Sequence, residues 1–88
     1  MISAATNVSA QDAGIQAHLR ELRNGNTLVF EARLRRAREE GELPPEADPK
    51  ALAGYLATVI QGMSQQARDG ATAADLSHVA ELALRAWP

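Results

Sequence analysis

The side chains that could do chemistry in this chain are few and scattered. The 88 residues contain no cysteine and no glycine-rich phosphate loop, and the only imidazoles are those of His18 and His78. Ser77 directly precedes His78, but neighbouring residues on a helix point about 100° apart and cannot form a nucleophile–base pair. We therefore expect no enzymatic activity and no cofactor.

One group of residues has the spacing of metal ligands. Asp75, His78 and Glu81 follow each other at three-residue steps and could share one side of a helix. A protein metal site needs three or four convergent ligands and a histidine oriented by a further group. The same spacing is typical of a polar helix flank that faces water, and we favour that interpretation and predict no metal site.

The basic residues form one cluster, which comprises Arg33, Arg35, Arg36 and Arg38. It could bind phosphate or an acidic partner. However, Glu31 lies four residues before Arg35 and Glu40 lies four residues after Arg36, and such pairs stabilise a solvated helix face. We interpret the cluster as structural.

The segment 60–87 has the outline of a DNA-binding helix-turn-helix, but its chemistry is wrong for that role. Its last helix carries Arg85 together with Asp75 and Glu81, whereas reading bases requires several donors aimed at the groove and positive flanks. The net charge of the chain is −2. We predict that this chain does not bind DNA directly.

Composition indicates one small domain that cannot bury much of its own surface. A chain of this size buries roughly 60–65% of the surface that its unfolded form exposes, and the aromatic residues are only Phe30, Tyr55 and Trp87. No apolar run approaches the ~20 residues of a membrane span. The first ten residues lack the basic and apolar regions of a signal peptide. We expect a cytoplasmic protein that gains stability by pairing with a second copy.

Periodicity predicts an all-α fold with a long first helix. Residues 1–8 read as a disordered leader, and Ser9 and Asp12 have the spacing of a capping box. Apolar residues then recur at three- and four-residue steps to Ala37. Their phase continues through Asn24-Gly25-Asn26, so we predict one helix of roughly 10–40 that ends at Gly41.

Two further helices are marked by their first residues. Asp48 followed by Pro49 is a strong start signal for a helix over 49–69. Thr72 and Asp75 form a second capping box that opens a helix over 73–87. The predicted fold is a three-helix bundle fragment, in which a long helix precedes an antiparallel helical hairpin.

The last two helices each carry a second stripe of small or apolar residues, about 100° from the first. A helix that is apolar over more than half its circumference is buried on more than one side. We therefore predict a homodimer with a four-helix interface, in which Gly62 lies near the closest approach. The predicted interface residues are Ala51, Tyr55, Thr58, Val59, Gly62, Gln66, Val79, Leu82, Ala83 and Ala86.

Three motifs over residues 9–88 together resemble the C-terminal half of the TetR-type (tetracycline-repressor-like) bacterial transcriptional regulators. The matching residues are Arg36, Ala37 and Glu40 to Leu43; Ala47 to Pro49 with Leu52 and Ala53; and Gln61, Gly62 and Ala67 to Gly70. The terminal LALRAWP is similar as well. In that family this half carries dimerisation and effector response, and a separate N-terminal domain binds DNA.

The resemblance implies that this chain is the dimerisation and effector-response domain of such a regulator, without its DNA-binding domain. Any small-molecule effector would then contact the first helix and the facing side of the middle helix, and the residues expected to face it are His18, Leu22, Val29 and Phe30. The alternative is a free-standing helical module that homodimerises, or that forms heterodimers with full-length relatives. The same interface serves both functions.

Overall fold

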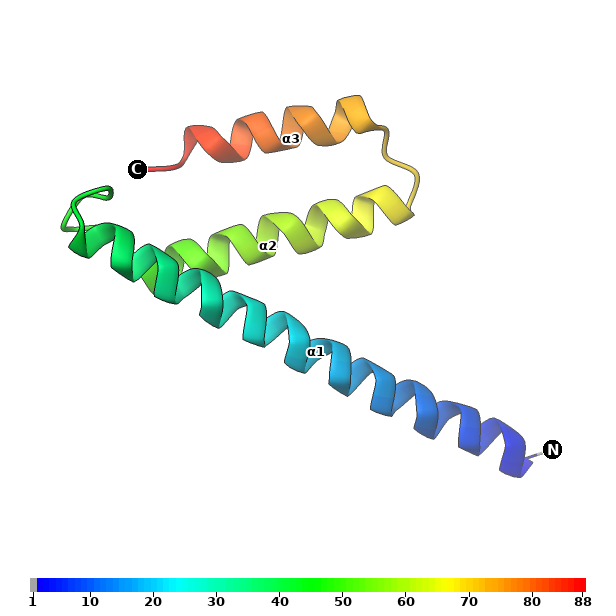
Figure 1. The fold of residues 1–88 in the computed structure, drawn as a ribbon. Coiled ribbons are helices and arrows are strands. Elements are labelled where there is room, and N and C mark those ends of the chain that lie inside the picture. Colours follow the sequence, from blue (N-terminus) through cyan, green and yellow to red (C-terminus); the bar gives the residue numbers. More distant parts are fainter. Residues whose placement is uncertain (1) are drawn as a thin grey trace.

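The computed structural model describes residues 2–88, and the side chains of residues 12–88. The chain forms α1 (Ile2–Glu39), α2 (Pro49–Arg68) and α3 (Ala73–Arg85), and this described part contains no strand (Figure 1). The predicted all-α fold of a long helix followed by a helical hairpin is confirmed.

Helix α1 is continuous through Asn24-Gly25-Asn26, as its apolar phase predicts. It begins at Ile2, which differs from the predicted start near residue 10. An N-cap residue has a non-helical backbone, and the residues before Ser9 are helical, so Ser9 is not the N-cap. Residues 2–8 of the predicted leader belong to α1, in keeping with the high helix propensity of Ala4 and Ala5. Met1 lies outside the described residues.

Helix α1 ends in a Schellman motif at Gly41, whose φ is +81°. The Glu42 amide donates to the Ala37 carbonyl at 2.8 Å, and the Gly41 amide donates to the Arg38 carbonyl at 3.2 Å. These two bonds satisfy carbonyls that the helix leaves without partners. Leu43 then folds back and is 7% exposed.

Helix α2 begins as the sequence predicts. The Asp48 side chain accepts hydrogen bonds from the amides of Lys50 at 3.1 Å and Ala51 at 3.2 Å, and Pro49 is the first helical residue. The Arg38 guanidinium donates to the Ala47 carbonyl at 3.2 Å. The end of α1 is thereby joined to the residues that cap α2.

The turn between α2 and α3 likewise combines a glycine of positive φ after one helix with a capping side chain before the next. Gly70 has a φ of +102°, and the Ala71 amide donates to the Gln66 carbonyl at 2.9 Å. The predicted capping box is present, because the Asp75 amide donates to Thr72 Oγ1 at 3.1 Å and the Thr72 amide donates to Asp75 Oδ2 at 3.3 Å. The Asp75 carboxylate therefore has a structural role.

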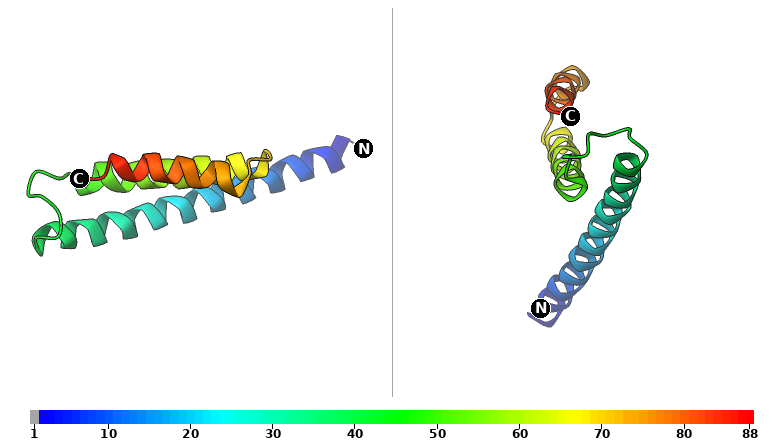
Figure 2. Two further views of the ribbon diagram at one scale, coloured as in Figure 1. Left: turned by 90° about the horizontal axis from the view of Figure 1, so that it is seen from above. Right: turned by 90° about the vertical axis from the view of Figure 1, so that its left-hand side faces the viewer.

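The three helices form an open arrangement with α2 in the middle. Helix α2 packs against both α1 and α3, whereas α1 and α3 do not pack against each other within residues 2–88. Helix α3 runs back along α2, and α1 projects away from this pair (Figures 1 and 2). The molecule measures 60 × 30 × 13 Å.

Little of the apolar content is covered by the chain itself. The buried residues of the described part are small or lie beside one corner of the fold, and they are Ala37, Leu43, Pro49 and Ala53. The accessible surface is 6704 Å². A folded monomer of 9.4 kDa is expected to expose about 5,000 Å². The chain thus exposes about 1,700 Å² more than a compact protein of its mass.

Candidate functional site

Helices α2 and α3 are joined by one long-range side-chain hydrogen bond. The Tyr55 hydroxyl donates to the Ala83 carbonyl at 2.6 Å, across 28 positions of sequence. Ala83 lies in the last turn of α3, and its carbonyl also accepts from the Ala86 amide at 3.3 Å. Tyr55 therefore fixes the end of α3 against α2 within one chain, a role that the dimer prediction did not anticipate.

Most of the residues predicted to form the dimer interface are exposed. Tyr55, Val59 and Ala83 are half-buried. The other seven are exposed, and we call them the outer stripe: Ala51, Thr58, Gly62 and Gln66 on α2, Val79 and Leu82 on α3, and Ala86 directly after α3. Leu82 is 62% exposed.

Both parts of the outer stripe lie on the same side of the α2–α3 pair. On each helix the outer stripe lies about 80–100° around the helix axis, in the same direction, from a row of half-buried apolar residues. These rows are Leu52, Leu56, Val59 and Met63 on α2, and Leu76, Ala80 and Ala83 on α3. Because the two helices run antiparallel (Figure 1), equal rotations bring the two parts of the outer stripe to one side. Helix α1 packs on the other side, against Ala53, which is 1% exposed.

Gly62 occupies the middle of the outer stripe. A Cβ atom built on this residue would meet nothing within 4 Å. Glycine in a helix interior costs ~1 kcal/mol relative to alanine, and the single chain offers no close approach that requires it.

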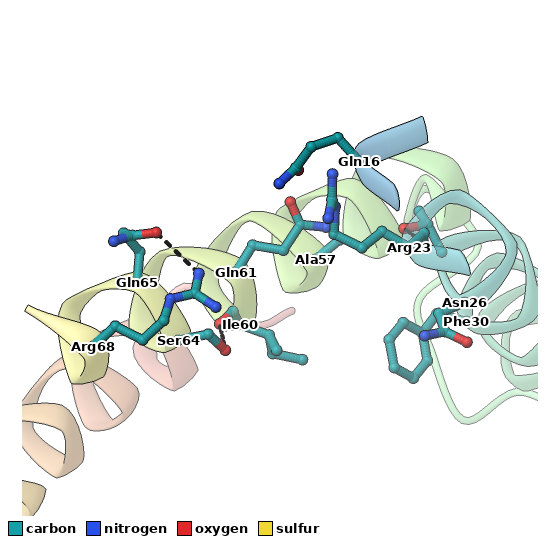
Figure 3. Close-up of a pocket in the computed structure, with 11 residues that line it drawn as sticks. Gln16, Arg23, Asn26, Phe30, Ala57, Ile60, Gln61, Ser64, Gln65 and Arg68 are labelled. Atoms are coloured by element: carbon teal, nitrogen blue, oxygen red, sulfur yellow. Dashed lines mark hydrogen bonds between the residues drawn. The ribbon is translucent and has the colours of Figure 1, made fainter. Parts of the chain in front are cut away.

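A groove of about 630 Å³ lies between α1 and α2 (Figure 3). We call it the α1–α2 groove. From α1 it is lined by Gln16, Arg23, Asn26, Thr27 and Phe30. From α2 it is lined by Ala57, Ile60, Gln61, Ser64, Gln65 and Arg68. The predicted location of effector contacts, on the first helix and the facing side of the middle helix, coincides with this groove.

Only one of the four residues expected to face a ligand lines the groove. Phe30 does so and is 39% exposed. Leu22 and Val29 are 52% and 67% exposed on other faces of α1, and His18 is exposed as well.

The polar residues of the groove were not anticipated from the sequence, although their spacing contains a signal. Gln61, Gln65 and Arg68 recur at four- and three-residue steps, and Gln16, Arg23 and Thr27 at seven and four. These steps place each set on one face of its helix. A search for polar helical periodicity would have found both sets.

The remaining charged clusters are structural. Arg35 pairs with Glu31 at 2.8 Å and Arg36 with Glu40 at 2.9 Å, as predicted, and Arg33 also contacts Glu42 at 3.4 Å. Within the part of the chain that the structure describes, no three acidic or metal-binding side chains gather into a potential metal site. No helix in residues 2–88 combines the length and the apolar character needed to cross a membrane.

Comparison with known proteins finds similarity to a bacterial regulator. Over all 88 residues the chain is 34% identical to the HTH-type transcriptional repressor ComR of Escherichia coli (strain K12), and it spans 42% of the length of that protein. No protein-family model matches the chain, and no solved structure matches it. The similarity indicates a chain of the transcription-regulator kind.

Proposed function

We propose that this chain is the dimerisation and effector-response domain of a TetR-type transcriptional regulator. The observation that carries the proposal is the exposed outer stripe, in a chain that is similar along its whole length to a transcriptional repressor. An apolar stripe on one side of a helical pair is expected to be covered by another surface.

The amount of exposed surface supports a second copy of the chain as the cover. The excess of about 1,700 Å² per chain, relative to a compact monomer, exceeds the ~800 Å² that each partner buries in a standard interface. The outer stripe also contains no charged residue, and its most polar members are Gln66 and Thr58. A two-fold axis through such a patch gives an isologous interface in which the stripe pairs with its own copy.

The α1–α2 groove supports the effector-response half of the proposal. Its volume of about 630 Å³ lies within the ~300–1,000 Å³ range of small-molecule sites. It also lies on the side of α2 away from the outer stripe, so one helix would connect a ligand on one face to the dimer interface on the other. Movement of α2 is therefore the simplest route by which binding could alter pairing.

The absence of cysteine allows a direct test of the interface. We expect sedimentation to give about twice the 9.4 kDa chain mass. Gly62→Cys should form a disulfide-linked dimer under mild oxidation, because a disulfide requires Cα atoms about 4.4–6.8 Å apart. Gly25→Cys is the matched control: Gly25 is also an exposed helical glycine with open space around it, but it lies on α1.

The proposal fails if the wild-type chain sediments as a monomer at tens of micromolar. It also fails if Gly25→Cys cross-links as quickly and completely as Gly62→Cys, since the reaction would then report random collision.

A further inference from the structure

We propose that the α1–α2 groove binds an amphipathic organic anion, with an apolar body about 10 Å long that ends in a carboxylate or sulfonate. The inference rests on the proposed function, because it names the chemical class of the effector. Three features of the groove carry it: its charge, the order of its side chains along its axis, and the donors that it leaves available.

The groove is cationic although the chain as a whole is acidic. Its lining includes Arg23 and Arg68 but no aspartate or glutamate, while the net charge of the chain is −2. The three ion pairs among the described side chains involve Arg33, Arg35 and Arg36, so neither groove arginine is neutralised in this way. A guanidinium is the side chain best suited to hold a carboxylate or sulfonate through two hydrogen bonds.

The apolar and cationic residues of the groove come from different positions along the two helices. Phe30, Ala57 and Ile60 are closer in sequence to the junction of α1 and α2 than Arg23 and Arg68 are. The helices then diverge toward the beginning of α1 and the end of α2 (Figure 1). Arg23 precedes Phe30 by seven residues and Arg68 follows Ile60 by eight. At a rise of ~1.5 Å per residue, the backbone of each arginine is about 10–12 Å further along its helix than that of the apolar residue.

The hydroxyl groups of the groove are already bonded within their own helices. Thr27 Oγ1 donates to the Arg23 carbonyl at 3.0 Å, and Ser64 Oγ donates to the Ile60 carbonyl at 2.9 Å. The Arg68 guanidinium donates to Gln65 Oε1 at 2.9 Å through one amino group. The donors that remain for a ligand are its other N–H groups, the Arg23 guanidinium and the amides of Gln16, Asn26 and Gln61. This set favours a ligand that accepts hydrogen bonds at the open end of the groove and presents an apolar surface toward the other end.

A pair of dyes that differ only in their charge provides the test. 1-Anilinonaphthalene-8-sulfonate has an apolar body of about the required length and one sulfonate, and N-phenyl-1-naphthylamine is the same body without the sulfonate. Titration of the 88-residue chain with each dye, followed by fluorescence, should give tighter binding of the sulfonate. Its affinity should fall as salt is raised from 50 to 500 mM, because exposed charges are screened, and that of the neutral dye should not.

Four variants locate the binding. Arg23→Gln and Arg68→Gln should each weaken sulfonate binding about 10-fold, the effect of losing one charge-assisted hydrogen bond, and leave the neutral dye unchanged. Phe30→Ala should weaken both dyes. Arg85→Gln, an exposed arginine on α3, changes the net charge equally and should have no effect. Circular dichroism of each variant checks that the helices persist.

Several outcomes overturn the inference. These are equal affinity for the two dyes, an Arg85→Gln effect as large as that of Arg23→Gln, or groove variants that bind like the wild type. Sedimentation of the same samples separates this failure from failure of the proposed function. A dimer that does not distinguish the dyes rejects the anion alone, whereas a monomer rejects the regulatory domain on which the inference rests.

Discussion

The junction between α1 and α2, residues 37–53, and the outer stripe differ in what covers their apolar side chains. At the junction, Ala37, Leu43 and Ala53 are buried by the chain itself, and the backbone is fixed by a Schellman motif and an Asp N-cap. In the outer stripe, Leu82 and Val79 lie in solvent. At the junction, the residues that cap the helices lie beside buried apolar side chains. In the outer stripe, the apolar side chains are not covered by the chain. The junction can therefore order itself, whereas the outer stripe is expected to need a partner.

The largest effect is expected at the outer stripe. Replacing Gly62 with leucine should push the paired helices apart, and overpacking typically costs ~1–3 kcal/mol per site. Because a symmetric dimer contains the site twice, dimerisation should weaken by about 2–6 kcal/mol. Sedimentation equilibrium over a concentration series measures this change.

A milder substitution separates the effect on dimerisation from the effect on helix stability. Gly62→Ala and Gly25→Ala should both gain helix propensity of ~1 kcal/mol per chain, since neither added Cβ meets an atom within the chain. Only Gly62→Ala should also weaken pairing. A Gly62→Leu protein that dimerises as tightly as the wild type would place the interface elsewhere.

The junction should respond next most strongly, and without involving the partner. Leu43→Ala removes a buried side chain at the junction, where the buried residues of the described part gather. Such changes typically cost ~2–3 kcal/mol at sites of this kind. Leu28→Ala is the matched control, because Leu28 is 65% exposed on α1 and its loss should cost less than ~0.5 kcal/mol. Thermal unfolding at one fixed protein concentration compares them. Equal losses of stability would contradict the assignment of the core to the junction.

A smaller effect is expected where α3 meets α2. Tyr55→Phe removes the hydrogen bond to the Ala83 carbonyl, which should cost ~1 kcal/mol. Trp87, which is half-buried just after α3, reports the docking of this helix through its fluorescence, and its emission should shift toward that of solvated tryptophan. Ser64→Ala removes a hydroxyl that bonds only within α2 and should leave both stability and emission unchanged. A red shift in Ser64→Ala, or none in Tyr55→Phe, would contradict the role of this bond.

The smallest response is expected toward DNA. Three of the four arginines at the end of α1 are paired with glutamates, and Arg38 donates to the Ala47 carbonyl. The outer stripe is uncharged, so neither region offers a strongly basic face. Fluorescence anisotropy with random and promoter duplexes should show no binding tighter than ~10⁻⁶ M at moderate salt, the upper end of non-specific affinity. Salt-sensitive binding in the nanomolar range would contradict the prediction that this chain does not bind DNA directly.

The sequence alone determined where α1 and α2 end and where α2 and α3 begin. The last helix was predicted to run to residue 87, whereas α3 ends at Arg85. Gly41 and Gly70 supply positive φ values, Asp48 and Thr72 supply side-chain acceptors, and Pro49 fits the first helical turn. These effects are local, since each depends on residues within about five positions. The exception is the start of α1, where the Ser9 signal was overridden because the preceding residues are themselves able to continue the helix.

Only the tertiary structure decided which helix faces contact one another. The crossing of α1 over α2 buries Ala53 and opens the groove beyond it, and this angle brings Arg23 and Arg68 to one site although 45 positions separate them. Tyr55 likewise bonds to α3, where the stripe pattern placed it in an interface. Helical periodicity gives the direction of a side chain about its own axis but not the neighbour that it reaches, because that depends on the angles between helices set by packing at the junction.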